Sequence, residues 1–132
     1  MRIGFGIALA AALLAGAGCA RAKAPPSGQE MFARHCASCH GLSGSGDGPL
    51  ADTLHKRPTD LTALARKNGG VFDHPGVMAI IDGRRAVREH GPREMPVWGA
   101  VFEEKLTGEP YGAYTALLHD RALADYVQSI QR

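Results

Sequence analysis

The sequence predicts a small all-α domain, and three observations support this class. Apolar residues recur at helical spacing in several short segments, no segment alternates for long as a β-strand would, and no internal repeat is present. The 132 residues suffice for one domain. Because 17 Gly and 8 Pro stand against 4 Phe, 3 Tyr and 1 Trp, we expect about four short helices joined by long loops.

The first residues have the layout of a secretory signal. A short positive start at Met1-Arg2 precedes an apolar run over residues 3–15, and small residues follow. The run is too short and ends too promptly for a transmembrane helix. We therefore expect residues 1–18 to be a signal peptide and the protein to be exported.

The end of this leader resembles a bacterial lipoprotein box, in which a cysteine receives a diacylglycerol and becomes the new N-terminus. Ala17, Gly18 and Cys19 fit this pattern, whereas Gly16 stands where a large aliphatic residue is usual. Ordinary cleavage after Ala22 would instead discard Cys19. We favour lipidation, because a cysteine at this place in a leader has no other evident role, and two acyl chains would anchor the protein firmly.

The expected domain covers residues 27–132 and follows a flexible tether over residues 19–26, which ends in two prolines. Its first helix should begin at Ser27, because Ser27 and Glu30 have the spacing of a capping box.

Three further helices are expected along the chain. One follows a cap at Thr59 or Asp60 and ends at Asn68, and another spans about residues 76–82. The C-terminal helix has the clearest apolar stripe, formed by Leu123, Tyr126, Val127 and Ile130.

The motif that carries chemistry is CxxCH, at Cys36, Cys39 and His40. Two thiols at this spacing can add to the vinyl groups on one edge of a haem, while the adjacent imidazole reaches the iron. A redox CxxC would need a βαβ context, and a structural zinc site would need a second ligand pair, which Cys19 alone does not supply. We therefore predict one covalent haem c, without which this glycine-rich chain should be largely unfolded.

Met95 is the best candidate for the opposite axial ligand. Pro96 bars ordinary helix at Met95, which leaves a soft thioether on a loop. His90 is the rival ligand, whereas Met78 has the setting of a core residue and Met31 precedes the motif too closely. The other histidines are expected at the surface: His35, His55, His74 and His119.

The CxxCH motif, the loop at Met95 and a terminal helix containing Tyr126 together resemble a bacterial class I monohaem cytochrome c, over roughly residues 27–130. The segment 103–115 is longer than the minimal pattern of that family and has no explanation in the sequence.

This resemblance implies two contacts. The N-terminal helix should cross the C-terminal helix through Gly28 and Phe32, which match the spacing of the family. The carbonyl of Pro58, or of Pro49, should accept a hydrogen bond from His40 and so orient its ring.

The resemblance implies a periplasmic one-electron carrier rather than an enzyme, since two occupied axial positions leave no open site on the iron. Its partners would be redox proteins such as a dehydrogenase, an oxidase or a respiratory complex. The formal charge of +2 falls once Arg2 is removed and the haem propionates are added, which argues against nucleic acid as a partner.

Two alternative functions stay open at this point. One is a haem enzyme or ligand sensor with a labile sixth site, and the other is a cytochrome subunit of a larger dehydrogenase or oxidase. A basic stretch ahead of the methionine loop is either a solvated face or a docking site for an acidic partner. It contains Arg84, Arg85, Arg88 and Arg93, interspersed with Glu89 and Glu94.

Overall fold

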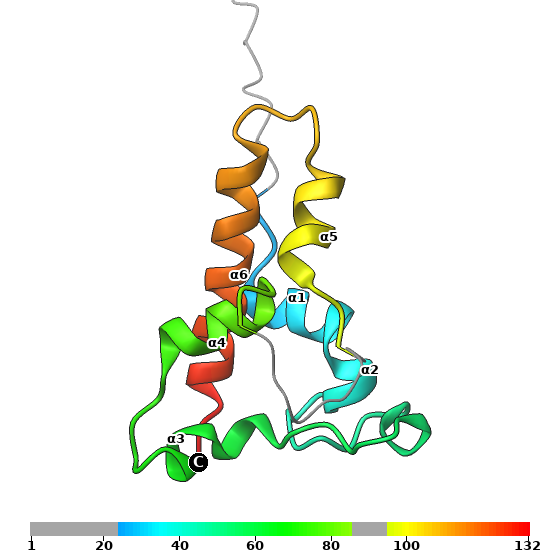
Figure 1. Ribbon diagram of the computed structural model, residues 1–132, viewed down its shortest axis with the longest axis vertical. Coiled ribbons are helices and arrows are strands. Elements are labelled where there is room, and N and C mark those ends of the chain that lie inside the picture. The colour runs from blue at the N-terminus through cyan, green and yellow to red at the C-terminus, as the bar shows by residue number, and fades with distance from the viewer. Residues whose placement is uncertain (1–23, 86–94) are drawn as a thin grey trace, which may run out of the picture.

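The computed structural model describes residues 24–85 and 95–132 (Figure 1). These residues form helices and loops without any β-strand, which confirms the all-α class. The α-helices are α1 (Gly28–His35), α2 (Ala37–His40), α3 (Leu64–Lys67), α4 (His74–Ile81), α5 (Trp98–Lys105) and α6 (Gly112–Ser129). Two short 3-10 helices, η1 (Ala51–Thr53) and η2 (Leu61–Ala63), lie between α2 and α3. The expected number of about four helices was too low, because α2 and α5 were not anticipated.

Helix α1 begins as the capping box predicts. Ser27 Oγ accepts a hydrogen bond from the Glu30 amide at 3.2 Å, and the Glu30 carboxylate accepts one from the Ser27 amide at 2.8 Å. Met31 and Phe32 are buried on one face of the helix. Cys36 caps the C-terminal end of α1. Because Met31 and Phe32 anchor this helix in the core, they also fix the position at which the CxxCH motif begins.

Helix α1 crosses α6 at very short range, as the resemblance implies. A Cβ atom added to Gly28 would lie 2.0 Å from the Ala122 carbonyl oxygen, so only glycine permits this approach. One turn later, the Phe32 ring lies 5.1 Å from the Tyr126 ring, measured between centroids, at an interplanar angle of 50°. With Phe32 only 1% exposed, this crossing closes one side of the core.

Helix α6 is the central element, and α1, α4 and α5 all pack against it (Figure 1). Its buried face, named the inner stripe below, consists of Ala116, Asp120, Leu123, Ala124 and Val127. Helix α4 begins slightly earlier than expected, because the Asp73 side chain accepts a hydrogen bond from the Gly76 amide at 3.0 Å and caps the helix there.

The helix expected after Thr59 or Asp60 forms as two pieces, η2 and α3. Asp60 is the residue that caps it, since its carboxylate accepts a hydrogen bond from the Thr62 amide at 2.9 Å. The helical segment ends at Asn68, as predicted.

The segment 103–115 completes a helical hairpin. Helix α5 and the first turns of α6 run antiparallel, and residues 106–111 connect them at the end of the molecule remote from α2 (Figure 1). Phe102 is 4% exposed and holds α5 on the core. None of the helices in the described ranges is long and apolar enough to cross a membrane.

Candidate haem site

The CxxCH motif lies on a rigid turn between two helices. Cys36 lies at the junction of α1 and α2, and the His40 amide donates to the Cys36 carbonyl at 2.9 Å. Gly41, with φ of 75°, ends α2 and turns the chain. The following loop returns onto α2, because the Gly48 amide donates to the Cys39 carbonyl at 3.1 Å. Cys39 and His40 are therefore held in a fixed relation to Cys36.

The His40 ring is oriented by a backbone carbonyl. Its Nδ1 lies 3.1 Å from the Thr59 carbonyl oxygen. A carbonyl oxygen only accepts, so Nδ1 carries the hydrogen and Nε2 keeps its lone pair. This is the tautomer that a metal-ligating histidine needs.

The acceptor is not the one that the resemblance implied. Neither Pro58 nor Pro49 supplies the carbonyl, because Thr59, one residue beyond Pro58, does so. The Pro58 carbonyl instead packs against Gly46, where an added Cβ would lie 2.3 Å from the carbonyl oxygen. The predicted acceptor, the Pro58 carbonyl, is therefore one residue away from the observed acceptor.

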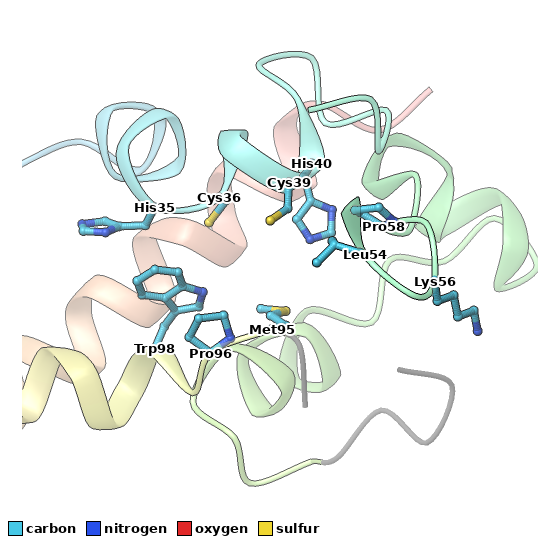
Figure 2. Close-up of a pocket in the computed structure, with 10 residues that line it drawn as sticks. All are labelled: His35, Cys36, Cys39, His40, Leu54, Lys56, Pro58, Met95, Pro96 and Trp98. Carbon is cyan, nitrogen blue, oxygen red and sulfur yellow. The ribbon is translucent and has the colours of Figure 1, made fainter. Parts of the chain in front are cut away.

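Both cysteines and His40 open into one pocket (Figure 2). Its walls are His35, Cys36, Cys39, His40, Leu54, Lys56, Pro58, Met95, Pro96 and Trp98. The pocket adjoins a second, largely apolar cavity of about 250 Å³, since Cys36, His40 and Met95 line both. The additional walls of the second cavity are Phe32, Thr59, Leu61, Leu64, Val77, Ile80, Ile81, Leu123 and Val127.

Met95 lies across this pocket from His40 (Figure 2). It is half-buried and packs against the core, while Pro96 after it is exposed. The other methionines lie elsewhere: Met31 is 3% exposed in the core, and Met78 packs on α4 and lines a different groove. His90, the rival ligand, lies outside the described residues.

The donor set and the lining of this cavity fit a haem. Apolar side chains would cover the macrocycle, an imidazole nitrogen and a thioether face each other, and two thiols lie at the wall. Burial, and then the neighbouring Cys39, raise the pKa of the Cys36 thiol to about 12. Redox-active thiols have lowered pKa values, so this environment argues against a thiol oxidoreductase site.

A zinc site finds no support either. Within residues 24–85 and 95–132, no group of at least three His, Cys, Asp or Glu side chains could hold a metal ion.

Two of the histidines expected at the surface are half-buried around Phe102, and one of them, His35, also lines the pocket. Between ring centroids, His35 lies 5.0 Å from Trp98 and 5.5 Å from Phe102, and His119 lies 5.4 Å from Phe102. Burial lowers the pKa of both histidines, and Lys105 and Arg34 lower that of His35 further. The sequence offered one signal for this cluster, namely that His35 shares a helix face with Met31 and Phe32.

Two further histidines, His55 and His74, were also expected at the surface. His55 is exposed as expected, whereas His74 is half-buried and bonded to Asp125.

The first part of the basic stretch is engaged in local ion pairs. Arg84 binds Asp82 just after α4, and Arg85 lies 3.2 Å from Asp73 at the start of the same helix. Both arginines are exposed, in agreement with a solvated face. Arg88 and Arg93 lie outside the described residues.

Comparison with known proteins supports this site. A family model described as cytochrome c oxidase, cbb3-type, subunit III matches residues 23–108, which include the CxxCH motif and Met95. No curated protein and no solved structure matches the chain. Since the match covers more than half of the sequence, the chain belongs to this cytochrome c family, whose members carry a covalently bound c-type haem.

Proposed function

We propose that this protein is a one-electron carrier with a single haem c in the described pocket. In this proposal Cys36 and Cys39 hold the haem through thioether bonds, and His40 and Met95 are the axial ligands. The observation that carries it is the placement of His40 and Met95 on opposite sides of one pocket, beside both cysteines (Figure 2). The family match supports electron transfer by a haem c domain.

The residues of the chain would set the properties of this centre. The hydrogen bond from His40 to Thr59 fixes the imidazole plane and increases the basicity of the ligating nitrogen. As a ligand of the haem iron, the Met95 thioether would favour the reduced state and raise the reduction potential. When bound, haem c supplies reversible one-electron chemistry between its ferric and ferrous states. Because both faces of the iron would be occupied, the protein itself would convert no substrate.

The absorption spectrum of the purified holo-protein tests the ligand assignment. We expect low-spin bands in both oxidation states and a ferric band from the bond between sulfur and iron. The Met95→Ala variant should lose that band, whereas the Met78→Ala variant, changed in a half-buried methionine outside the pocket, should keep it. High-spin wild-type iron that binds carbon monoxide at once would contradict the carrier and favour a haem enzyme or sensor.

We further propose that the protein works in the bacterial periplasm, anchored to a membrane through lipidated Cys19. The leader over residues 1–18 supports export, and haem is attached to CxxCH motifs outside the bacterial cytoplasm. Residues 19–26 would tether the cytochrome domain, residues 27–132, to the anchor. Intact mass spectrometry of the mature protein should show one haem and a diacylglycerol on Cys19. A mature chain that begins after Ala22 would refute the anchor.

A second candidate function is that of a cytochrome subunit in a larger respiratory complex. The family description, which names an oxidase subunit, favours this possibility. An affinity-tagged chain purified from solubilised membranes should then co-purify with oxidase or dehydrogenase subunits in constant stoichiometry. Recovery of the haem protein alone, in a form that still exchanges electrons with soluble redox proteins, would favour the free carrier.

A further inference from the structure

The α5–α6 hairpin carries exposed apolar and aromatic side chains that the haem site does not use. We name them the outer stripe: Tyr111, Tyr114, Leu117 and Leu118, which are 82%, 61%, 47% and 43% exposed. The last three lie at positions i, i+3 and i+4 of α6 and thus on one face of the helix. This face differs from the inner stripe, so α6 has two apolar faces and only the inner one packs in the core of the described structure.

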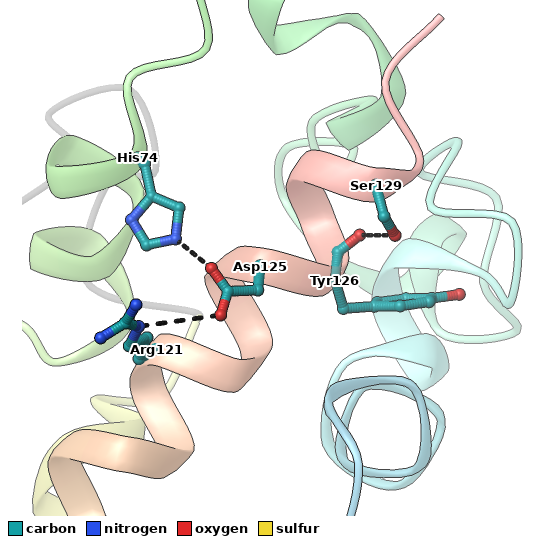
Figure 3. Close-up of polar contacts among 5 residues, drawn as sticks. All are labelled: His74, Arg121, Asp125, Tyr126 and Ser129. Carbon is teal, nitrogen blue, oxygen red and sulfur yellow. Dashed lines mark hydrogen bonds and ion pairs between the residues drawn. The ribbon is translucent and has the colours of Figure 1, made fainter.

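The outer stripe borders a groove whose charges are paired with one another. Tyr114, Leu117 and Leu118 line it together with Met78 of α4, and its polar end is formed by His74, Arg121 and Asp125. The Asp125 carboxylate is 2.7 Å from His74 Nε2 and 3.9 Å from Arg121 Nε (Figure 3). Since Arg121 and Asp125 carry opposite charges and lie side by side, recognition at this groove depends on its apolar side chains.

Tyr111 stands out for its backbone conformation. Its φ is 63°, and it is the one non-glycine residue with positive φ in the described ranges. Glycine or asparagine would adopt this conformation at lower cost. The Tyr111 ring is 82% exposed and does not pack in the core. The fold therefore gives no reason for an aromatic residue there, which points to a contact outside the domain.

The chain enters the domain at this same end. Pro26 lines a cavity with Lys105 and Leu106, which lie at the end of α5 where the hairpin turns, and Figure 1 shows the first described residues descending beside the hairpin. An extended chain spans at most about 3.5 Å per residue, so residues 19–26 reach no further than roughly 28 Å. Any anchor on Cys19 would keep the hairpin close to the membrane.

We propose that the outer stripe inserts into the surface of a phospholipid bilayer. Tyrosine rings favour the boundary between lipid and water, and apolar side chains near the start of a helix can insert there. The domain would then stand with its hairpin on the membrane, while α2 and the haem pocket, at the opposite end, face the aqueous phase (Figure 1).

The charges near the hairpin connection predict the mode of binding. Glu104, Lys105 and Glu109 are exposed and have mixed signs, so they offer no strong attraction to anionic headgroups. Binding should accordingly depend on apolar insertion and vary little with salt or with the content of anionic lipid.

The test uses the holo-protein with Cys19→Ser and without residues 1–18, so that neither an acyl chain nor the apolar leader contributes. It should sediment with phosphatidylcholine vesicles. Leu117 and Leu118 together expose about as much surface as one whole leucine side chain, so Leu117→Ser/Leu118→Ser should weaken partitioning roughly tenfold. The matched control is Leu50→Ser/Val71→Ser, which changes exposed apolar residues outside the hairpin and should leave partitioning unchanged.

A second variant separates membrane binding from folding. Tyr111→Gly relieves the positive φ and should raise the melting temperature, yet it removes an inserted ring and should lower vesicle binding. A more stable protein that binds vesicles less cannot have lost binding through unfolding.

Three results would overturn the proposal. The Cys19→Ser protein could fail to sediment with any vesicles, or it could bind only vesicles containing phosphatidylglycerol and detach in salt. It could also show a protein–protein contact, seen as an oligomer that Leu117→Ser/Leu118→Ser dissociates while vesicle binding is absent.

Discussion

Asp120 is a carboxylic acid buried where the ends of α4 and α5 meet α6. It is 3% exposed, and its Oδ1 has no hydrogen-bond partner in the described part of the chain. A Cβ added to Gly99 would lie 3.3 Å from Asp120 Oδ2 and 2.9 Å from Asp82, which shows how tightly the three residues pack. Burial, followed by the charges of Asp82 and Glu103, raises the pKa of Asp120 to about 6, although Arg84 opposes this.

This raised pKa makes stability depend on pH in a defined direction. The unfolded value is 3.8 and the folded value about 6, so between these two the folded protein holds a proton that the unfolded chain has lost. The free energy of unfolding therefore falls as pH rises through this window, and the stabilisation present at low pH is gone above it. A tenfold change in an ionisation constant corresponds to 1.36 kcal/mol, which gives an effect of about 3 kcal/mol.

Asp120→Asn removes the ionisation while keeping the shape of the side chain. We expect the variant and the wild type to be similarly stable at about pH 4 and the variant to be about 3 kcal/mol more stable at about pH 7.5. Denaturant unfolding of the holo-protein, followed by circular dichroism, measures both values. Asp52→Asn, which changes an exposed carboxylate in η1, is the control and should show no such difference. A variant that is less stable than wild type at the higher pH would refute the reasoning.

Three further variants test the packing, the backbone and the cofactor. Gly28→Ala would press a methyl group onto the Ala122 carbonyl and should destabilise the holo-protein by about 1–3 kcal/mol in denaturant unfolding; an unchanged midpoint would contradict the close crossing. Tyr111→Gly should stabilise it by about 1 kcal/mol in the same assay, because it relieves a left-handed backbone, and a loss of stability would show that the ring packs. Cys36→Ala/Cys39→Ala should give a largely unfolded chain by circular dichroism, since the cavity of about 250 Å³ would then lack the covalent haem; a cooperative melt with full helicity would refute this.

The elements that could be predicted from the sequence are those held by hydrogen bonds between residues close together in the chain. The Ser27 and Glu30 pair sets the start of α1 by hydrogen bonds within one turn, and Asp60 caps the next segment in the same way. The CxxCH motif and Met95 were also recognisable, because Pro96 restricts the backbone beside the methionine regardless of distant contacts. The structure brings these residues to one pocket.

The features that sequence reasoning missed depend on contacts between distant segments. Helix α5 contains Gly99, a poor helix former, and forms there because glycine lets α5 approach Asp82 and Asp120. Thr59 rather than Pro58 reaches His40, while the Pro58 carbonyl packs against Gly46 of a separate loop. No local pattern reveals either arrangement.

The contact between α1 and α6 also affects when haem can be attached to the chain. The partner of α1 is α6, the described helix most distant from it in the sequence, so the Gly28 crossing cannot form until α6 has been made. Such a contact between the two ends of a chain has a high contact order and forms late. Until then, Phe32 has no Tyr126 to pack against, and the cysteines beside it stay accessible. The topology therefore leaves an interval in which haem can be joined to the two cysteines before the fold closes over it.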